Sequence, residues 1–164
     1  MAKEGEYQLD VLLELRQKER EDAEGRYAEV LSGYHRAGET VRRAQEKHRL
    51  LVEERRQKTR EFDQAAALEA TEMAAMQGFD FYLEGLLDQE GRVLEELEQA
   101  REEQLQAQRR MRSAHQEMLG AIKALQAVEK HFESWQREQR QIAQRKEANR
   151  MDDVAARIWR EQRS

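Results

Sequence analysis

Histidines, serines and adjacent acidic pairs are the residues of this sequence that could do chemistry. A pair of histidines that binds a metal from one helix must stand three or four positions apart, and no such pair occurs among His35, His48, His115 and His131. The serines lie in polar helical contexts, and the sequence holds no phosphate-binding loop and no GxSxG motif. Acidic pairs such as Glu53–Glu54 are adjacent on faces that we expect to be exposed. We therefore expect no catalytic residue, no metal ligand and no cofactor.

The composition restricts the class of protein further. The 164 residues include no proline and no cysteine, and 38% are charged, against roughly 25% in an average protein. Without proline, nothing obliges a helix to kink or stop. Without cysteine, disulfides, thiolate chemistry and most structural zinc sites are excluded. This composition fits helices that bury one narrow stripe and solvate the remaining surface.

The sequence gives no sign of a membrane or secretory segment. No stretch approaches the roughly 18 apolar residues that a membrane-spanning helix needs. The start, MAKEGEYQLD, lacks the apolar core of a secretion signal. We expect Met1 to be the natural beginning of a cytoplasmic protein.

Heptad spacing is the main structural signal, and it occurs twice. Steps of four and three residues run over about six repeats in each half, which is typical of a coiled coil rather than of an isolated amphipathic helix. Leu94, Leu105 and Ile122 are expected to widen the second stripe. The first stripe contains Leu9, Leu13, Arg16, Arg20, Ala23, Tyr27, Val30, Tyr34, Ala37, Val41, Ala44, His48 and Leu51, and the second contains Val93, Leu97, Ala100, Gln104, Ala107, Met111, Ala114, Met118, Ala121, Leu125, Val128, Phe132 and Trp135.

The heptad spacing fails between the stripes, in residues 64–78. Thr71 or Asp80 could cap a new helix and Gly78 could end the preceding one, so we expect the turn within this window. The predicted fold is all-α, a long antiparallel two-helix coiled-coil hairpin that forms a single domain over residues 1–164. Helix 1 is expected at about 7–64 and helix 2 at about 72–160. Folding about residue 70 would set Tyr34 near Leu105 and leave the end of helix 2, roughly from residue 132, as an overhanging helix.

The predicted seam between the helices is poor. Charged or polar side chains occupy several of its core positions, and glycines interrupt helix 1, each costing about 1 kcal/mol relative to alanine. We expect a rod of marginal stability that a partner could complete. The core positions concerned are Arg16, Arg20, His48, Arg55 and Lys58, and the glycines are Gly25, Gly33 and Gly38.

Beside the turn, residues 73–87 are crowded with methionine, leucine and aromatic side chains. Because these residues are nearly consecutive, they point around the helix rather than into one seam. They fit a plug that closes the end of the hairpin, an adaptable contact surface for a partner, or both. The candidate contact residues at this tip are Met73, Met76, Phe79, Tyr82, Leu83 and Leu86.

Charge is segregated along the chain. Residues 61–98 carry eleven acids and one base, whereas residues 137–164 carry eight bases and five acids. The acidic region is expected to avoid nucleic acid, because binding to the phosphate backbone depends on lysine and arginine. Overall the chain is acidic and its basic stretch lacks interleaved aromatic residues, so we expect no nucleic-acid partner. The basic stretch also lacks the apolar face that binding to a membrane surface requires.

Two short motifs resemble a known family. Near the start, the pattern Leu12-x-x-Leu15-x-x-Lys18-Glu19-x-x-Asp22-Ala23 resembles the opening helix of the FliJ/YscO family, the coiled-coil stalk proteins of flagellar export and type III secretion. Near the end, Asn149-Arg150-Met151-Asp152-Asp153-x-Ala155-x-Arg157 is similar to the closing segment of that family. Phe79 to Leu87 matches in position the aromatic patch beside the hairpin turn of the family.

The resemblance implies a central stalk, similar in shape to the shaft of a rotary ATPase. Its terminal helices would enter the pore of the hexameric export ATPase and promote assembly and activity of the hexamer. Its tip would reach the membrane-embedded export gate, so the protein would be peripheral to the membrane through protein contacts, and secretion chaperones would be further partners. For the ATPase the resemblance implies Leu12, Leu15, Lys18, Arg150, Met151, Asp152 and Trp159.

Alternatives stay open at this point. The chain could be a generic coiled-coil scaffold or adaptor without an ATPase partner, including a parallel homodimer. The break at residues 64–78 and the unequal stripes count against the parallel dimer. Membership of a flagellar or of an injectisome system stays undecided.

Overall fold

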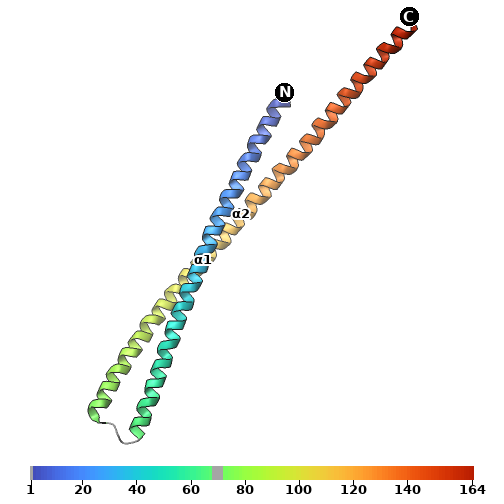
Figure 1. The fold of residues 1–164 in the computed structure, drawn as a ribbon. Helices are drawn as coiled ribbons and strands as arrows, with labels where there is room; N and C mark the ends of the chain where they lie inside the picture. The colour runs from blue at the N-terminus through green and yellow to red at the C-terminus, as the bar shows by residue number, and fades with distance from the viewer. Residues whose placement is uncertain (1, 68–71) are drawn as a thin grey trace. The chain divides into compact units, whose positions relative to one another are not determined.

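Two long helices make up the protein. The computed structural model describes residues 2–67 and 72–164, with side chains described from residue 8 onward. Helix α1 spans Ala2–Ala67 and helix α2 spans Met73–Arg163, and no strand occurs in the described ranges (Figure 1). The expected all-α hairpin is confirmed. Both helices extend somewhat further than expected, because no proline stops them.

The start of α2 differs from the expectation. Gly78 and Asp80 lie inside α2, so the prediction that they end or cap a helix is wrong. The backbone oxygen of Glu72 accepts hydrogen bonds from the N–H groups of Ala75 and Met76, at 3.0 and 3.1 Å, which begins the first turn of α2. Good helix formers around Gly78 offset its cost of about 1 kcal/mol. The predicted cap Thr71 lies outside the described residues.

The chain divides into two compact units. Unit 1 comprises Met1–Gly25 and Gln116–Ser164, and unit 2 comprises Arg26–His115. Each unit therefore contains part of α1 and part of α2. The prediction of a single domain stays a prediction.

In unit 2 the two helices pack antiparallel. The buried residues Val41 and Ala44 on α1 form a core cluster with Leu97 and Ala100 on α2. Further along, the rings of Tyr27 and His115 lie 5.3 Å apart. Alanine at several core positions lets the helices approach closely but buries little apolar area.

The register of unit 2 differs slightly from the one expected. Leu105, which was expected near Tyr34, is 48% exposed. A methyl group on Gly38 would instead lie 3.4 Å from Nε2 of Gln104. The packing of core side chains between the helices, rather than the midpoint of residues 64–78, sets which residue of α1 lies opposite which residue of α2.

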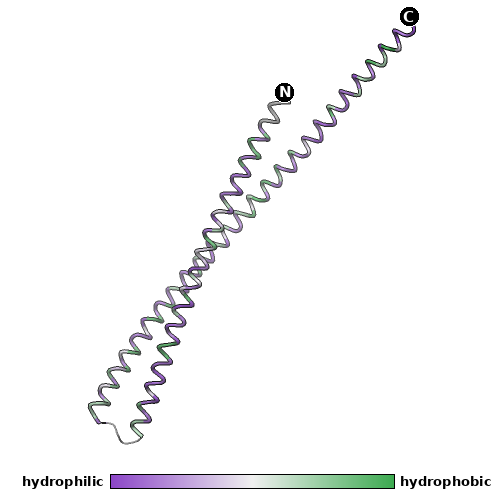
Figure 2. The backbone as a smooth tube through the Cα atoms, viewed as in Figure 1, coloured by the Kyte–Doolittle hydropathy of each residue, from purple (hydrophilic) through white to green (hydrophobic). Residues whose placement is uncertain are grey.

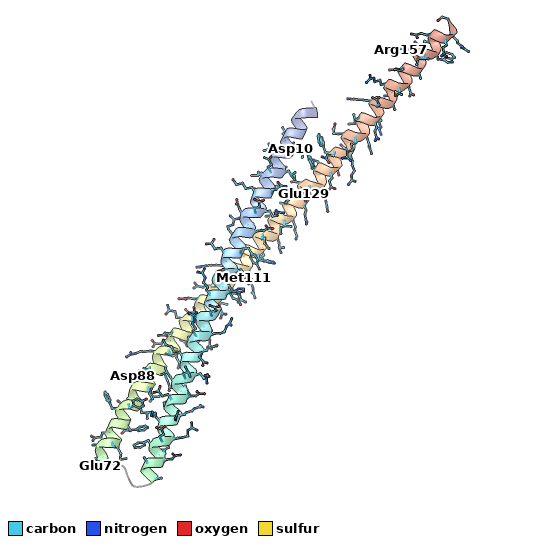
Figure 3. The ribbon with its side chains drawn as sticks, in the orientation of Figure 1. Asp10, Glu72, Asp88, Met111, Glu129 and Arg157 are labelled. Atoms are coloured by element: carbon cyan, nitrogen blue, oxygen red, sulfur yellow. The ribbon has the colours of Figure 1, made fainter. Side chains whose placement is uncertain are left out.

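In unit 1, α2 is longer than the part of α1 available to pack against it. Ala23 on α1 and Leu125 on α2 are buried, and Phe132 and Trp135, whose rings are 6.0 Å apart, are half-buried. Every residue from Arg140 to Ser164 is exposed. Figure 3 labels Glu129 on α2 below Asp10 on α1, with α2 continuing past both to Arg157.

All residues predicted for the two heptad stripes are buried or half-buried. The expectation that Leu94 and Leu105 widen the second stripe is wrong, since they are 45% and 48% exposed. Lys58 is also exposed, where it pairs with Glu61 instead of entering the core. Hydrophobic residues are interspersed with hydrophilic ones along both helices in Figure 2.

Candidate partner-binding surfaces

Part of the apolar cluster beside the turn is a plug inside unit 2. The ring of Phe79 on α2 stacks on Phe62 of α1, with centroids 4.1 Å apart and planes at 5°. Leu86 follows on the same side of α2 and is 5% exposed. Aromatic stacking contributes about 0.5–1.5 kcal/mol beyond the burial of area. Phe79 and Leu86 therefore hold the two helices together near the turn.

The remaining apolar residues of this region point to solvent. Met73 and Phe81 are 78% and 80% exposed, and Met76 and Leu87 are 46% and 48% exposed. We call these four residues the tip surface. Among the predicted contact residues, only Met73 and Met76 belong to it, while Leu83 is half-buried. Phe81 and Leu87 were not among the predicted contact residues. Their position in the apolar run 79–87 could have identified them.

Tyr82 is fixed by α1. Its hydroxyl donates a hydrogen bond of 2.6 Å to Oε1 of Glu54. This bond to a carboxylate, with a smaller contribution from desolvation, raises the pKa of Tyr82 above its ordinary value. The ring is thereby held beside a shallow hollow lined by Phe81, Tyr82, Gly85, Leu86 and Gln89.

Acidic side chains surround the tip surface. Glu72, Asp80, Glu84 and Asp88 are all exposed on this part of α2. Figure 3 marks its extent with the labels Glu72 and Asp88. Residues 72–91 contain no lysine or arginine. A partner for the tip surface would need an apolar contact with basic residues around it.

A second exposed apolar surface lies near the end of α2. Met151, Val154, Ile158 and Trp159 are 61%, 44%, 50% and 57% exposed, and their spacing places them on one side of the helix. We call these four residues the C-terminal surface. The guanidinium of Arg163 lies 4.1 Å from the centre of the Trp159 ring, a cation–π contact that orients the indole.

The structure does not bring together the residues that were predicted for the ATPase. On α1, Leu12 is half-buried, Leu15 is 50% exposed and Lys18 is exposed. The α2 residues from Arg150 onward follow Glu129 by more than twenty residues, within the stretch of α2 that is exposed throughout. At 1.5 Å per residue this is about 30 Å along the helix. Arg150, Met151, Asp152 and Trp159 therefore form a separate, exposed group.

Comparison with known proteins decides the family. The profile described as "YscO-like protein" matches residues 4–164. The chain belongs to the YscO-like family. No curated protein and no solved structure matches the chain. The resemblance stated from the two terminal motifs is confirmed, and it relates the chain to type III secretion and flagellar export.

The two surfaces of this YscO-like protein present large apolar side chains on the continuous helix α2, a chemistry suited to binding a partner. In the described parts of the chain, no group of three or more metal-binding side chains comes together. Neither described helix has a window long and apolar enough to cross a membrane.

Proposed function

We propose that this YscO-like protein is the central stalk of an export ATPase complex. It links the hexameric ATPase to the export gate and promotes assembly and activity of the hexamer. In this proposal the protein is cytoplasmic and associates with the secretion apparatus at the inner membrane through protein contacts. Secretion chaperones are further partners in the same proposal.

The family match over residues 4–164 is the observation that carries this proposal. Two exposed surfaces of different charge support it. The tip surface in unit 2 is surrounded by acids, whereas the C-terminal surface in unit 1 lies in a stretch with an excess of bases. Two chemically distinct surfaces suit a protein that contacts two different partners.

We assign the C-terminal surface to the ATPase. Fully burying a methionine or isoleucine side chain stabilises a complex by about 1.5–3 kcal/mol each, and tryptophan is enriched among residues that dominate binding energy. Met151, Ile158 and Trp159 can thus contribute to binding once a partner covers them. The same reasoning assigns Phe81 and Leu87 of the tip surface to the gate.

A turnover assay with the purified export ATPase tests the proposal. The wild-type chain is expected to stimulate ATP hydrolysis when it is present at fewer copies than ATPase subunits. Met151→Asp/Ile158→Asp is expected to reduce this stimulation at least tenfold, because two charges replace the apolar contacts. Leu50→Asp/Leu119→Asp is the matched control, since Leu50 and Leu119 are 52% and 41% exposed outside both surfaces.

A second arm of the experiment separates the two surfaces. Phe81→Ala/Leu87→Ala should retain helicity and ATPase stimulation but lose binding to the export gate in a pull-down with the cytoplasmic part of the gate. Phe79→Ala should instead lower thermal stability, since Phe79 stacks on Phe62. A wild-type chain that neither binds nor stimulates the ATPase would contradict the stalk and favour a generic coiled-coil adaptor.

A further inference from the structure

A second apolar row runs along α2 beside its contact with α1. Met76, Leu83, Leu87, Leu94 and Leu105 follow one another at intervals of seven, four, seven and eleven residues, which keeps them on one helix face. Leu83 is half-buried and the others are 45–48% exposed. We call this row the α2 flank. It has the spacing of a coiled-coil seam, but it faces solvent.

Acids border the α2 flank at the neighbouring helical positions. The exposed residues concerned are Asp80, Glu84, Glu95, Glu98 and Glu102. Arg101, seven residues after Leu94, lies in the row itself, so the part of the flank that only acids border runs from Met76 to Leu94. An apolar row bordered by carboxylates fits an amphipathic helix that has basic residues beside its own apolar row. The chemistry of the flank therefore specifies the kind of partner that it accepts.

The chain itself contains such a helix. Residues 140–163 are exposed throughout and carry seven bases and four acids. Within them, Met151, Val154 and Ile158 form an apolar row, and Arg150 and Arg157, seven residues apart, border it on one side. Glu147 and Glu161, four residues before Met151 and three after Ile158, lie at the two ends of the row. From Met151 to Ile158 the row spans about 10 Å, against about 17 Å from Leu83 to Leu94. The apolar row of residues 151–158, which arginines border, is therefore short enough to lie along the α2 flank, which acids border.

A second copy of the chain is the occupant that these observations favour. Both rows belong to the single continuous helix α2, and a helix cannot fold back onto itself. We propose that residues 140–163 of one copy bind the α2 flank of another copy, with apolar row against apolar row and Arg150 and Arg157 near the carboxylates of the flank. This association does not depend on the proposed stalk function. It would compete with the ATPase for the C-terminal surface.

The expected association is weak and sensitive to salt. Both rows are short, so the buried area falls in the range of transient interfaces. Exposed charges contribute much of the specificity, and roughly 1 M salt reduces the screening length to about 3 Å. Self-association should therefore occur at high protein concentration and low ionic strength.

Sedimentation equilibrium of the full chain tests the proposal through a charge swap. For the wild type, the average mass should rise above 19.5 kDa with concentration in about 50 mM salt, and it should return to the monomer value in about 1 M salt. In Arg150→Glu/Arg157→Glu, two acids replace the arginines that face the acidic flank. In Glu84→Lys/Glu95→Lys, two of the five acids of the flank become bases and repel Arg150 and Arg157. Each variant alone should stay monomeric, and a mixture of the two should associate again.

A matched variant controls for the change in net charge. Glu14→Lys/Glu21→Lys makes the same change as Glu84→Lys/Glu95→Lys at two exposed positions of α1, and it should self-associate like the wild type. Circular dichroism must show equal helicity for all variants.

Three results would overturn the proposal: a monomeric wild type at every concentration, single variants that associate like the wild type, or a mixture that stays monomeric. A monomeric wild type would assign the α2 flank to a basic helix of another protein. Because the ATPase is absent from this experiment, its failure leaves the proposed stalk function untouched.

Discussion

The carboxylate of Glu90 is buried in unit 2. Glu90 is 8% exposed and accepts a hydrogen bond of 2.6 Å from Nε of Arg55, whose side chain is 31% exposed. Removing a charge from water costs several kcal/mol, and a good ion pair recovers this cost only in part. The pair therefore adds little to stability. It favours the helix register in which Glu90 lies opposite Arg55, because any other register would leave the buried carboxylate unpaired.

Loss of one partner should reveal this dependence. Glu90→Gln is expected to lower the free energy of unfolding by about 1–2 kcal/mol, because it leaves the half-buried guanidinium of Arg55 without its carboxylate. Arg55→Leu/Glu90→Leu should return the free energy of unfolding to near the wild-type value or above it. Urea denaturation followed by circular dichroism measures both changes.

The exposed pair Lys47–Glu96 provides the comparison. It also joins α1 to α2, at 3.4 Å, but its side chains are 62% and 57% exposed. Glu96→Gln should change the free energy of unfolding by less than about 0.5 kcal/mol. Equal effects of Glu90→Gln and Glu96→Gln would show that burial is not what gives the first pair its importance.

Among the elements, the beginning of α1 is the part whose seam is least satisfied. Arg16 and Arg20 occupy seam positions and are half-buried, and the Nε atom of each is buried without a hydrogen-bond partner. Nη1 of Arg16 contacts Glu19 at 2.7 Å, whereas Nε of Arg20 lies 3.7 Å from Glu24. A buried donor without a partner costs about 1–3 kcal/mol. The two unpaired Nε atoms therefore lower the stability of the packing between this segment of α1 and α2.

Apolar replacement at these two positions should stabilise unit 1. Arg16→Leu/Arg20→Leu is expected to raise the free energy of unfolding by about 1–3 kcal/mol, because it removes two unsatisfied donors and adds apolar contact. Hydrogen exchange of the amides around residues 9–25 should slow accordingly. Arg36→Leu/Arg42→Leu, at exposed positions of α1, should show no such gain. A destabilised Arg16→Leu/Arg20→Leu variant would mean that the guanidinium groups make favourable contacts after all.

At the scale of the whole molecule, the heptad stripes could be predicted because their spacing is a property of a single helix. Each predicted stripe position is buried or half-buried, from Leu9 to Leu51 and from Val93 to Trp135. The division of the tip could not be predicted in this way. Phe79 turns inward because Phe62 lies opposite, and Tyr82 is held because Glu54 lies opposite, and neither partner is close in the sequence.

The separation of the terminal residues follows from the predicted overhang of helix 2 from about residue 132, although the family resemblance grouped them. Motifs at the two ends of the chain suggested one binding site, but α1 has 66 residues and α2 has 91. Because α2 is longer than α1, Arg150 lies in the part of α2 that α1 does not cover, and every residue from Arg140 onward is exposed.

The placement of the tryptophans has a spectroscopic consequence. Trp135 and Trp159 are the two tryptophans of the chain, and both lie on α2 within unit 1. Intrinsic tryptophan fluorescence therefore reports only the unfolding of unit 1, whereas circular dichroism at 222 nm averages over both units. Unit 1 buries Ala23 and Leu125, while unit 2 contains the four-residue core cluster. We expect the fluorescence midpoint in urea to fall below that of circular dichroism, and coincident midpoints would show that the two units unfold as one.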